Sequence, residues 1–559
     1  MALEAIYKSQ GARIENIQLY RPGGLHPVQV GDNFKSGRYE IIHKLGKGHF
    51  STVWLARDGQ QCVAIKVHSV EGSKRTQEVA IHRRLAKDEA EYRTATIVKL
   101  IDWFNVRGPN GLHTCLVLDL HGPCLDDLCN GETKIRPDVG RTLARQIAEA
   151  LRFLHERNVA FGDLSPDNIL IKAAGLNEMS TRSLYNILGR PRPETVVHLT
   201  GDKYKPHAPK VVYPSIDFSR LELDMLQPQA VLTDLNEAVL IDDLDGHYPS
   251  GIHHHYASPE FMLGIHGTHT KGSDVWALAC TFYKLRSGAL MMPFTTRHLY
   301  ATSVQHLIGP FPGPLQTKMP AAAQGEVAML SQGDLEASKS TLWHRLEEIG
   351  AWKPWHTMTR DNRREHIISW GKAMCEETGS NPCEGPDFDL EARLDTGPPP
   401  PAKMSSTEFS DFHDLLSSML KYDPEKRISI EDILNHPWLN RQYQDLDEQN
   451  IHWVARFDQG QTEYWTPSQN SVKIGVDIND KCDLVDRLPP GLLDELMLAM
   501  DETDDMIYFS EGEAFWDARE HQMLYDVDTD EKQSTAYDVT QAAHSASELE
   551  VSQLLGLPT

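Results

Sequence analysis

The sequence predicts an α+β fold with two lobes, and three observations support this prediction. The chain has 559 residues, enough to bury a large core in one two-lobed domain with extensions. Strand-like segments gather before residue 120, whereas a long helical pattern first appears at residues 137–157. After that helix come residues 161–170, in which Asp163 and Asn168 precede an apolar strand.

The first predicted strand, residues 39–45, leads into a turn that contains two glycines. Gly46 and Gly48 let backbone amides approach phosphate oxygens, although such a pair is also typical of any tight turn. The strand at residues 63–67 carries Lys66, 20 residues after Gly46. This spacing favours a phosphate-binding lysine over an exposed lysine on an edge strand.

A phosphate-binding lysine needs a carboxylate to orient it. Residues 76–87 have helical character, with Ile81 and Leu85 on the inner face. Glu78 is the first acidic residue of this helix, and we predict that it pairs with Lys66. The alternative is a solvated acid in the first turn of the helix.

Two further strands and a hinge are predicted next. Residues 97–104 and 114–120 have strand patterns, and the second strand ends at His121-Gly122-Pro123. This break suits a hinge between lobes, where backbone groups receive an adenine ring. The long helix at residues 137–157 then leads to the polar loop.

The loop at residues 161–170 has the residues that phosphoryl transfer needs. Asp163 is placed to accept or orient the proton of an attacking hydroxyl, and Asn168 is placed to hold a magnesium ion. The same spacing also occurs by chance in a polar turn before a buried strand. The interpretation therefore depends on partners found elsewhere in the chain.

Those partners continue after an irregular stretch that contains prolines. The strand pattern breaks after residue 172 and resumes at residues 230–236, where Asp234 is placed to bind the magnesium ion. Asn236 lies in the turn after this aspartate, at a position where such turns usually have glycine. We expect Asn236 to tolerate left-handed backbone angles there. The histidines at 253–255 are not interpreted as a metal site, because consecutive histidines do not converge on one ion.

Composition restricts the cellular setting of the chain. The eight cysteines are scattered without a CxxC pair, which favours a reducing compartment and argues against structural zinc. The first residues do not resemble a signal peptide, and no apolar run approaches the roughly 20 residues of a membrane helix. We therefore expect a soluble intracellular protein that does not bind membranes.

The formal net charge of −25 is unevenly distributed. Residues 441–559 contain 26 Asp and Glu against 7 Lys and Arg, a net charge of −19. This acidity speaks against direct nucleic-acid binding. Two interpretations remain open, a solvated acidic tail and an electrostatic attraction for basic partners.

Taken together, these residues resemble the eukaryotic-type protein kinases, and more narrowly the SR-protein kinase family. The resemblance covers roughly residues 20–175 and 228–440, with gaps. It is most specific at Gly23-Gly24-Leu25-His26-Pro27-Val28 and at Lys44-Leu45-Gly46-x-Gly48-His49-Phe50-Ser51-Thr52-Val53-Trp54-Leu55. Ser51, in place of a third loop glycine, is a trait of that family.

The resemblance implies a fold, a reaction and a substrate class. The fold would be the bilobal protein-kinase fold, with a small β-rich lobe, a larger helical lobe and ATP in the cleft between them. The reaction would transfer the γ-phosphoryl group of ATP to Ser or Thr hydroxyls, with Mg²⁺ as the cofactor. Family substrates are basic Arg/Ser-rich splicing factors that dock in an acidic groove.

Site residues follow from the same resemblance. Asp163, Lys66 and Glu78 would be catalytic, and Asn168 and Asp234 would bind the metal. The residues expected to contact ATP are Leu45, Gly46, Gly48, Phe50, Ser51, Val53, Ala64, Lys66, Asp119 and Leu120.

Other motifs would have scaffold roles in a kinase. Glu260 would form a buried ion pair with Arg427, and Asp274 would brace the catalytic loop. The expected segments are an N-terminal extension (1–38), the small lobe (39–120), the large lobe (121–440) and an acidic extension (441–559). Inserts are expected at about 173–228 and 309–404, with a stiff linker of four prolines at 398–401 and a short amphipathic helix at 492–500.

Three positions depart from the usual kinase pattern. Phe161 replaces a histidine, which we interpret as an exchange of one packed ring for another. Gly162 replaces an arginine that grips a phosphorylated activation loop, and SR-protein kinases lack that arginine too. Ser165 replaces the lysine that contacts the transferred phosphoryl group, a loss that costs about 10²–10³-fold in rate unless another cation substitutes.

Two other functions compete with an active Ser/Thr kinase. A pseudokinase would bind nucleotide or a basic partner without turnover, and Phe161, Ser165 and Asn236 favour it. A small-molecule kinase of the aminoglycoside-phosphotransferase type shares a similar catalytic loop but lacks the scaffold motifs around Glu260 and Asp274. By the family resemblance, we expect a monomer found in both cytoplasm and nucleus.

Overall fold

A computed structural model describes most of the first 443 residues. The described residues are 7, 11, 13–129, 133–199, 207–242, 254–265, 268–292, 297–313, 341–349, 404–443 and 454–458, with short strands at 461–462, 506–508, 514–517 and 522–525. Most of the predicted insert at 309–404, the four prolines, His253 and the predicted helix at 492–500 lie outside these residues. The chain divides into two compact units, Met1–Pro467 and Ser468–Thr559.

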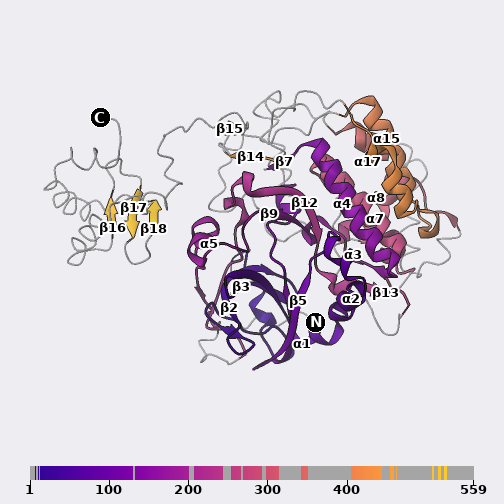
Figure 1. The fold of residues 1–559 in the computed structure, drawn as a ribbon. Helices are drawn as coiled ribbons and strands as arrows, with labels where there is room; N and C mark the ends of the chain where they lie inside the picture. Colours follow the sequence, from indigo (N-terminus) through magenta and orange to yellow (C-terminus); the bar gives the residue numbers. More distant parts are fainter. Residues whose placement is uncertain are drawn as a thin grey trace, which may run out of the picture. The chain divides into compact units, whose positions relative to one another are not determined.

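An antiparallel sheet of six strands forms the first lobe, in the order β1-β2-β3-β4-β6-β5. Figure 1 labels β2, β3 and β5 of this sheet, in the indigo part of the ribbon. The predicted strand at 97–104 begins later, at Leu100, because Ile97 instead pairs with Leu232 of another strand. The strands are β1 (Asn33–Phe34), β2 (Tyr39–Lys47), β3 (Ser51–Asp58), β4 (Gln61–His68), β5 (Leu100–Gly108) and β6 (Gly111–Leu118).

Three short helices follow β4. They are α1 (Val70–Arg75), α2 (Glu78–Leu85) and α3 (Glu89–Thr94). Ser69 begins α1 because its hydroxyl accepts the amide hydrogen of Gly72. In α2 the buried face contains Ile81 and Leu85, as predicted. Glu78 is also fully buried there, so it is not a solvated acid.

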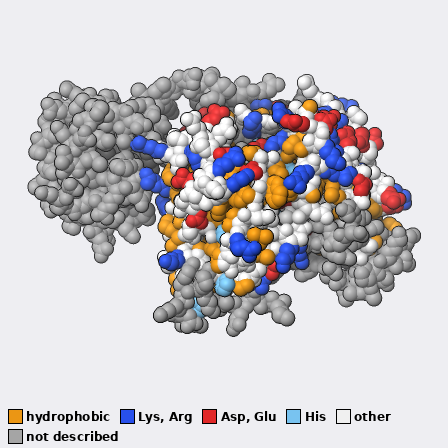
Figure 2. Space-filling model, turned by 60° about the horizontal axis from the view of Figure 1, so that its bottom comes forward, with side chains coloured by type: hydrophobic (Ala, Val, Ile, Leu, Met, Phe, Trp, Pro, Cys, Tyr) orange, Lys and Arg blue, Asp and Glu red, His pale blue; other side chains and the backbone are white. Residues whose placement is uncertain are grey.

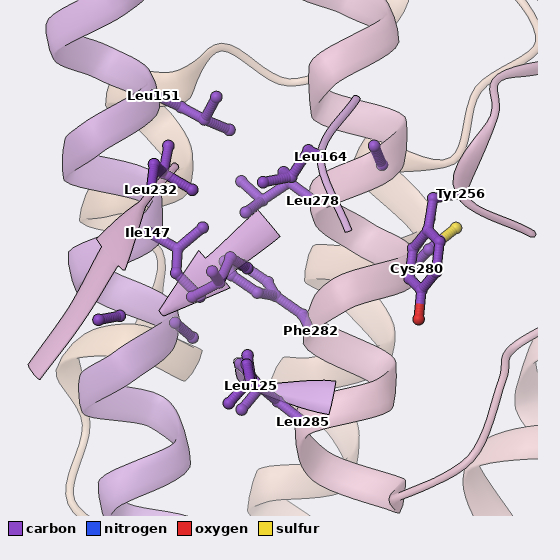
Figure 3. Close-up of a cluster of buried hydrophobic side chains, with 14 of the residues drawn as sticks. Leu125, Ile147, Leu151, Leu164, Leu232, Tyr256, Leu278, Cys280, Phe282 and Leu285 are labelled. Atoms are coloured by element: carbon purple, nitrogen blue, oxygen red, sulfur yellow. The ribbon is translucent and has the colours of Figure 1, made fainter. Parts of the chain in front are cut away.

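Helices dominate the second lobe. Helix α4 begins with Pro137, whose fixed φ and missing amide hydrogen suit the first helical position. In Figure 3, Ile147 and Leu151 of α4 face Leu278 and Phe282 of α7, with Leu164 of the polar loop between the helices. The helices are α4 (Pro137–Glu156), α6 (Pro259–Met262), α7 (Lys271–Ser287), α8 (Arg297–Ile308), α12 (Leu342–Glu347), α15 (Ser406–Met419), α16 (Ile430–Asn435) and α17 (Pro437–Asn440).

Two antiparallel strand pairs position the polar loop. Strand β8 (Val159–Ala160) pairs with β13 (Val239–Leu240), and β9 (Ile169–Ala173) pairs with β12 (Leu226–Leu232). The loop at 161–168 therefore leaves one pair and enters the other. Its two ends are fixed by sheet hydrogen bonds.

Within the stretch at 173–228, the described residues, 173–199 and 207–228, are more ordered than the expected irregular region. Helix α5 (Thr181–Leu188) begins at Ser180, whose hydroxyl accepts the amide hydrogen of Ser183. Strands β10 (Glu194–Thr195) and β11 (Val211–Val212) also pair. The expectation was wrong because the Ser cap and the buried Leu184 and Leu188 of a short helix were overlooked.

This insert and the N-terminal extension pack together against the first lobe. They share an apolar cluster, and both contact β2. The Tyr185 hydroxyl donates to Ile42 O at 2.9 Å, and Ile216 N donates to Lys44 O at 2.9 Å. Lys44 also forms a buried ion pair with Glu15 of the extension. The cluster consists of Tyr7, Ile14, Ile17, Leu19, Tyr20, Leu25, Ala208 and Val212.

The acidic region contributes strands to both units. In the first unit, β14 (Val454–Asp458) pairs with β7 (Thr133–Ile135) and with β15 (Gln461–Thr462). In the second unit, β16 (Met506–Tyr508), β17 (Ala514–Asp517) and β18 (Gln522–Tyr525) form an antiparallel sheet.

Among the described helices, none is both long enough and apolar enough to cross a membrane.

Candidate active site

Lys66 stands between two carboxylates. Its Nζ lies 2.7 Å from Oε2 of Glu78 and 2.7 Å from Oδ1 of Asp234. The predicted contact between Lys66 and Glu78 is therefore present. The Glu78 side chain is fully buried, whereas that of Asp234 is 41% exposed. Strand β4, helix α2 and the segment after β12 thus meet at one ammonium group.

The two buried partners shift each other's pKa. Burial favours the neutral form of Lys66, but Asp234 and Glu78 outweigh it and raise the lysine pKa above its ordinary value. Burial likewise favours the neutral form of Glu78, but the charge of Lys66 outweighs it and lowers the carboxyl pKa. Both groups are therefore charged at neutral pH.

Asp163 and Asn168 meet within the polar loop. The Asn168 side chain donates from Nδ2 to the Asp163 carbonyl oxygen at 2.8 Å and to its Oδ2 at 2.9 Å. Leu164, fully buried in the large core, anchors the loop between them. This arrangement fixes the Asp163 carboxylate and leaves the amide oxygen of Asn168 out of both bonds.

The loop is held from below by Asp274 of α7. Its Oδ2 accepts from Phe161 N at 2.8 Å, and its Oδ1 accepts from Gly162 N at 2.9 Å. His155 Nε2 lies 2.8 Å from the same Oδ2. Phe161 is fully buried in the large core. These contacts agree with the expected bracing role of Asp274 and with ring packing at Phe161.

Gly162 occupies a place where no side chain fits. Its φ is +85°, and a Cβ would approach Glu237 O to 2.5 Å and His269 Cδ2 to 2.7 Å. An arginine at this position would need the backbone to move. The backbone conformation at this position therefore requires glycine and excludes arginine.

The register of β9 and β12 brings the two predicted metal ligands together. Asn168 directly precedes β9, and Asp234 follows β12 by two residues. Ile169 pairs with Leu232, and Thr233 N donates to Asn168 O at 3.0 Å. Residues far apart in sequence thus reach the same end of one strand pair.

The donor set at this end fits a hard divalent cation. Asp234 uses Oδ1 to accept both from Lys66 and from Asn236 N, the latter at 3.2 Å. Its other carboxylate oxygen and the Asn168 amide oxygen are of the type that Mg²⁺ prefers. Within the described residues, no group of three or more His, Cys, Asp and Glu side chains is arranged to hold a metal.

The left-handed backbone was expected at Asn236 but occurs at Asp234, whose φ is +60°. Asp234 caps a short 3₁₀ helix, Leu235–Glu237, so the change of direction occurs before that helix. Asn236 lies inside it and is not among the residues with positive φ. The expectation was wrong because the turn begins two residues earlier.

Three of the predicted ATP-contacting residues lie in one apolar cluster. Ala64 belongs to its buried part, and Leu45 and Val53 pack against it. The cluster also contains buried residues that were not predicted to contact ATP. These additional buried residues are Val98, Leu116, Leu118 and Val231.

The glycine turn is a tight hairpin between β2 and β3. Gly46 pairs with Val53, and Gly48 N donates to Ser51 O at 2.8 Å. Ser51 is buried, and Phe50 O accepts the amide hydrogen of Ser69. The turn is thereby tied to the start of α1.

At the predicted hinge, Asp119 and Leu120 differ in environment. The Asp119 carboxylate has two protein partners. It accepts a hydrogen bond from Lys99 N at 2.6 Å, and it lies 3.1 Å from His121 Nε2. Leu120 packs against the large core. Gly122 N donates to Ile171 O at 2.9 Å, so β9 supports the hinge.

Ser165 is fully buried. Among the described residues its hydroxyl has no hydrogen-bond partner, and its carbonyl oxygen accepts from Asn168 N at 3.0 Å. The contribution of Ser165 that the structure shows is therefore its carbonyl oxygen, which accepts the amide hydrogen of Asn168.

A buried ion pair joins the other scaffold motifs. Arg427 donates to both carboxylate oxygens of Glu260, at 2.8 Å and 2.6 Å, and both side chains are almost fully buried. The guanidinium also lies over the ring of Trp276 in α7. The expected pair is present.

The comparisons with known proteins agree with this geometry. A family model described as protein kinase domain matches residues 39–179 and 247–439. The serine/threonine-protein kinase SRPK of Physarum polycephalum is 27% identical over 445 residues, covering 76% of this chain and 91% of the relative. Protein kinase dsk1 of Schizosaccharomyces pombe is 39% identical over 166 residues, covering 28% of this chain and 30% of the relative.

Human SRSF protein kinase 3 is 34% identical over 178 residues, covering 30% of this chain and 31% of the relative. The alignments with the human and fission-yeast proteins thus span about a third of those relatives. The match to the family model covers more than half of this chain. The chain therefore belongs to the protein kinase family, and the relatives that it resembles within that family include SRPK kinases.

Proposed function

We propose that this protein transfers the γ-phosphoryl group of ATP to Ser or Thr hydroxyls of proteins. The observation that carries the proposal is the position of Lys66, 2.7 Å from both Glu78 and Asp234 and fully charged between them. A lysine held in this way is oriented to bind phosphate oxygens. The same lobe contributes the apolar cluster around Ala64, which would take the adenine ring.

Asp163 would act on the substrate hydroxyl. Asn168 holds its carboxylate through Oδ2, so the group is oriented before a substrate arrives. The hydroxyl proton would pass to the carboxylate as the oxygen bonds to the γ-phosphorus. The bond from that phosphorus to the bridging oxygen would break in the same step and release ADP. Because Asp274 fixes the backbone amides of Phe161 and Gly162, the loop does not need to rearrange for this step.

Asn168 and Asp234 would hold the divalent cation, which we propose to be Mg²⁺. When bound, the cation neutralises charge that develops on the phosphate oxygens. Lys66 would provide the second positive charge in the site. Ser165 provides none, so we expect a slower enzyme than one with a lysine at that position.

We propose basic Arg/Ser-rich proteins as the substrate class. The support is the similarity to SRPK kinases and the net charge of −25. On the face shown in Figure 2, acidic and basic side chains are mixed among apolar ones. Residues 441–559 carry a net charge of −19, which is most of the total, so this region is the candidate source of attraction.

The test is phosphate incorporation from labelled Mg-ATP into an Arg/Ser-repeat peptide, with Asp163→Ala as the control. Incorporation that disappears in the control supports the proposal. A second peptide, with Lys in place of Arg, separates recognition of arginine from recognition of charge. Bound nucleotide without incorporation into any Ser/Thr substrate would instead identify a pseudokinase.

We also propose that the protein acts as a monomer in cytoplasm and nucleus, without direct contact to nucleic acid or membranes. The similarity to SRPK kinases supports the location, and the acidic charge supports the absence of nucleic-acid binding. Imaging of a fluorescent fusion and light scattering of the purified protein test these two points. A dimeric mass or exclusion from the nucleus would contradict them.

A further inference from the structure

His68 ends strand β4, two residues after Lys66. Because side chains alternate along a strand, both residues point to the same face of the sheet. The His68 side chain is fully buried, and its Nε2 lies 3.3 Å from Oε2 of Glu78. Lys66 Nζ approaches the same oxygen at 2.7 Å. One carboxylate oxygen therefore has two basic neighbours from one strand.

Packing alone does not explain a histidine at this position. Within the described part of the chain, neither ring nitrogen of His68 forms a hydrogen bond of good geometry. Buried polar atoms without such bonds destabilise a protein, and an aliphatic side chain would avoid that cost. Ile65 and Val67 fill the opposite face of β4 with such side chains. The contact with Glu78 is the interaction that an imidazole makes here and an aliphatic side chain would not.

When no divalent cation is bound at Asp234, one ammonium group near His68 faces two carboxylates. Lys66 carries one positive charge, and it faces the carboxylates of both Glu78 and Asp234. His82, one turn after Glu78 on α2, does not balance them, because burial lowers its pKa to about 4. A second donor toward Glu78 is therefore favourable on electrostatic grounds.

We propose that His68 is a positioning residue that holds Glu78, and with it α2, against β4. The other carboxylate oxygen, Oε1, accepts from Leu235 N at 3.3 Å. Glu78 is thus held by β4 on one side and by the segment after β12 on the other. His68 keeps this arrangement when the Lys66 ammonium turns toward a phosphate. The kinetic consequence rests on the proposed kinase function, whereas the structural part does not.

A double-mutant cycle tests whether His68 acts through Glu78. His68→Leu removes the ring nitrogens and keeps apolar volume, whereas His68→Gln keeps a side-chain amide donor. We expect His68→Leu to lower kcat about tenfold, with a smaller change in KM for the peptide, and His68→Gln to recover most of that loss. In a Glu78→Gln background, adding His68→Leu should cause no further loss. Additive losses would overturn the proposal.

A second measurement does not depend on catalysis. Hydrogen exchange of the α2 amides should be faster in His68→Leu than in the wild type, and no faster when Glu78→Gln is added. The matched control is His43→Leu, which removes another buried histidine of the same sheet that contacts Tyr185 instead. Unchanged exchange in α2, or the same change in His43→Leu, would show that His68 only fills space. If no peptide is phosphorylated, the proposed function fails, but this exchange experiment still decides the role of His68.

Discussion

The backbone amide of Thr233 donates a hydrogen bond to the carbonyl oxygen of Asn168 at 3.0 Å. This bond continues the pairing of β9 with β12 beyond its last pair, Ile169 with Leu232. It keeps Asp234 beside Asn168 although Asp234 follows Asn168 by 66 positions in the sequence. The metal site is thus a consequence of strand register.

Lys66→Met and Asp234→Ala should each abolish phosphorylation, a loss of at least about 10²–10³-fold. The first removes the only ammonium that touches both carboxylates of this site within the described residues. The second removes a predicted metal ligand. Lys172→Met, at an exposed position of β9, is the matched control. Full activity of either site variant would contradict the assignment.

Breaking the pair of Glu260 and Arg427 should destabilise the first unit by about 3–5 kcal/mol, because one buried charge is left unpaired. Glu260→Gln and Arg427→Met each test this by urea unfolding. The double variant Glu260→Met with Arg427→Met should lose less than the two single losses combined. The control is Arg38→Met, which breaks an exposed ion pair with Asp58. If this variant loses as much free energy of unfolding as the single variants of the buried pair, burial is unimportant here.

Two buried histidines should make stability fall in acid. Burial lowers the pKa of His26 and of His82 to about 4, from an unfolded value of 6.5. Between these values the unfolded chain binds more protons than the folded chain. The free energy of unfolding should therefore fall as pH decreases from 6.5 to 4, by up to about 1.4 kcal/mol per pH unit for each histidine.

Urea unfolding at several pH values, with the wild type and His82→Gln, measures this slope. The variant should have a shallower slope because one of the two histidines is absent. An unchanged slope would mean that His82 is not held neutral in the folded protein.

The acidic second unit should increase affinity for basic peptides. Residues 468–559 contain 21 Asp and Glu against 5 Lys and Arg. Removing them after Pro467 keeps the whole first unit, including β14. Binding of an Arg/Ser-repeat peptide, followed by fluorescence anisotropy, should weaken at low salt, and the difference should vanish at about 0.5 M salt because charges are screened. Unchanged affinity and salt dependence would mean that this unit is not a docking surface.

Local spacing was enough to predict much of the fold and the contacting groups. Lys66 follows the glycine turn at a fixed interval, and Glu78 is the first acid of the next amphipathic helix. Both signals are local in the sequence, so they can be recognised without knowing how the elements pack. The strands at 39–45 and 63–67 and the helix at 137–157 were predicted for the same reason.

Long-range contacts could not be predicted in this way. Nothing near Tyr185 or Ile216 in the sequence indicates that they bond to β2. His68 was overlooked although its spacing from Lys66 places both on one face of β4. Alternation shows which side chains share a face, but the partner on that face comes from α2. The helical segment α5 was missed for a local reason, because its Ser180 cap and its buried leucines were overlooked.

The shared cluster of the N-terminal extension and the insert determines where this protein can be shortened. The family match begins at residue 39, but a chain cut there would expose Ala208 and Val212 and deprive the buried Lys44 of Glu15. An unpaired buried charge destabilises a protein by several kcal/mol. Because Tyr7 belongs to the same cluster, we expect the smallest autonomous folding unit to begin no later than Tyr7. The boundary of homology and the boundary of stable folding would then not coincide.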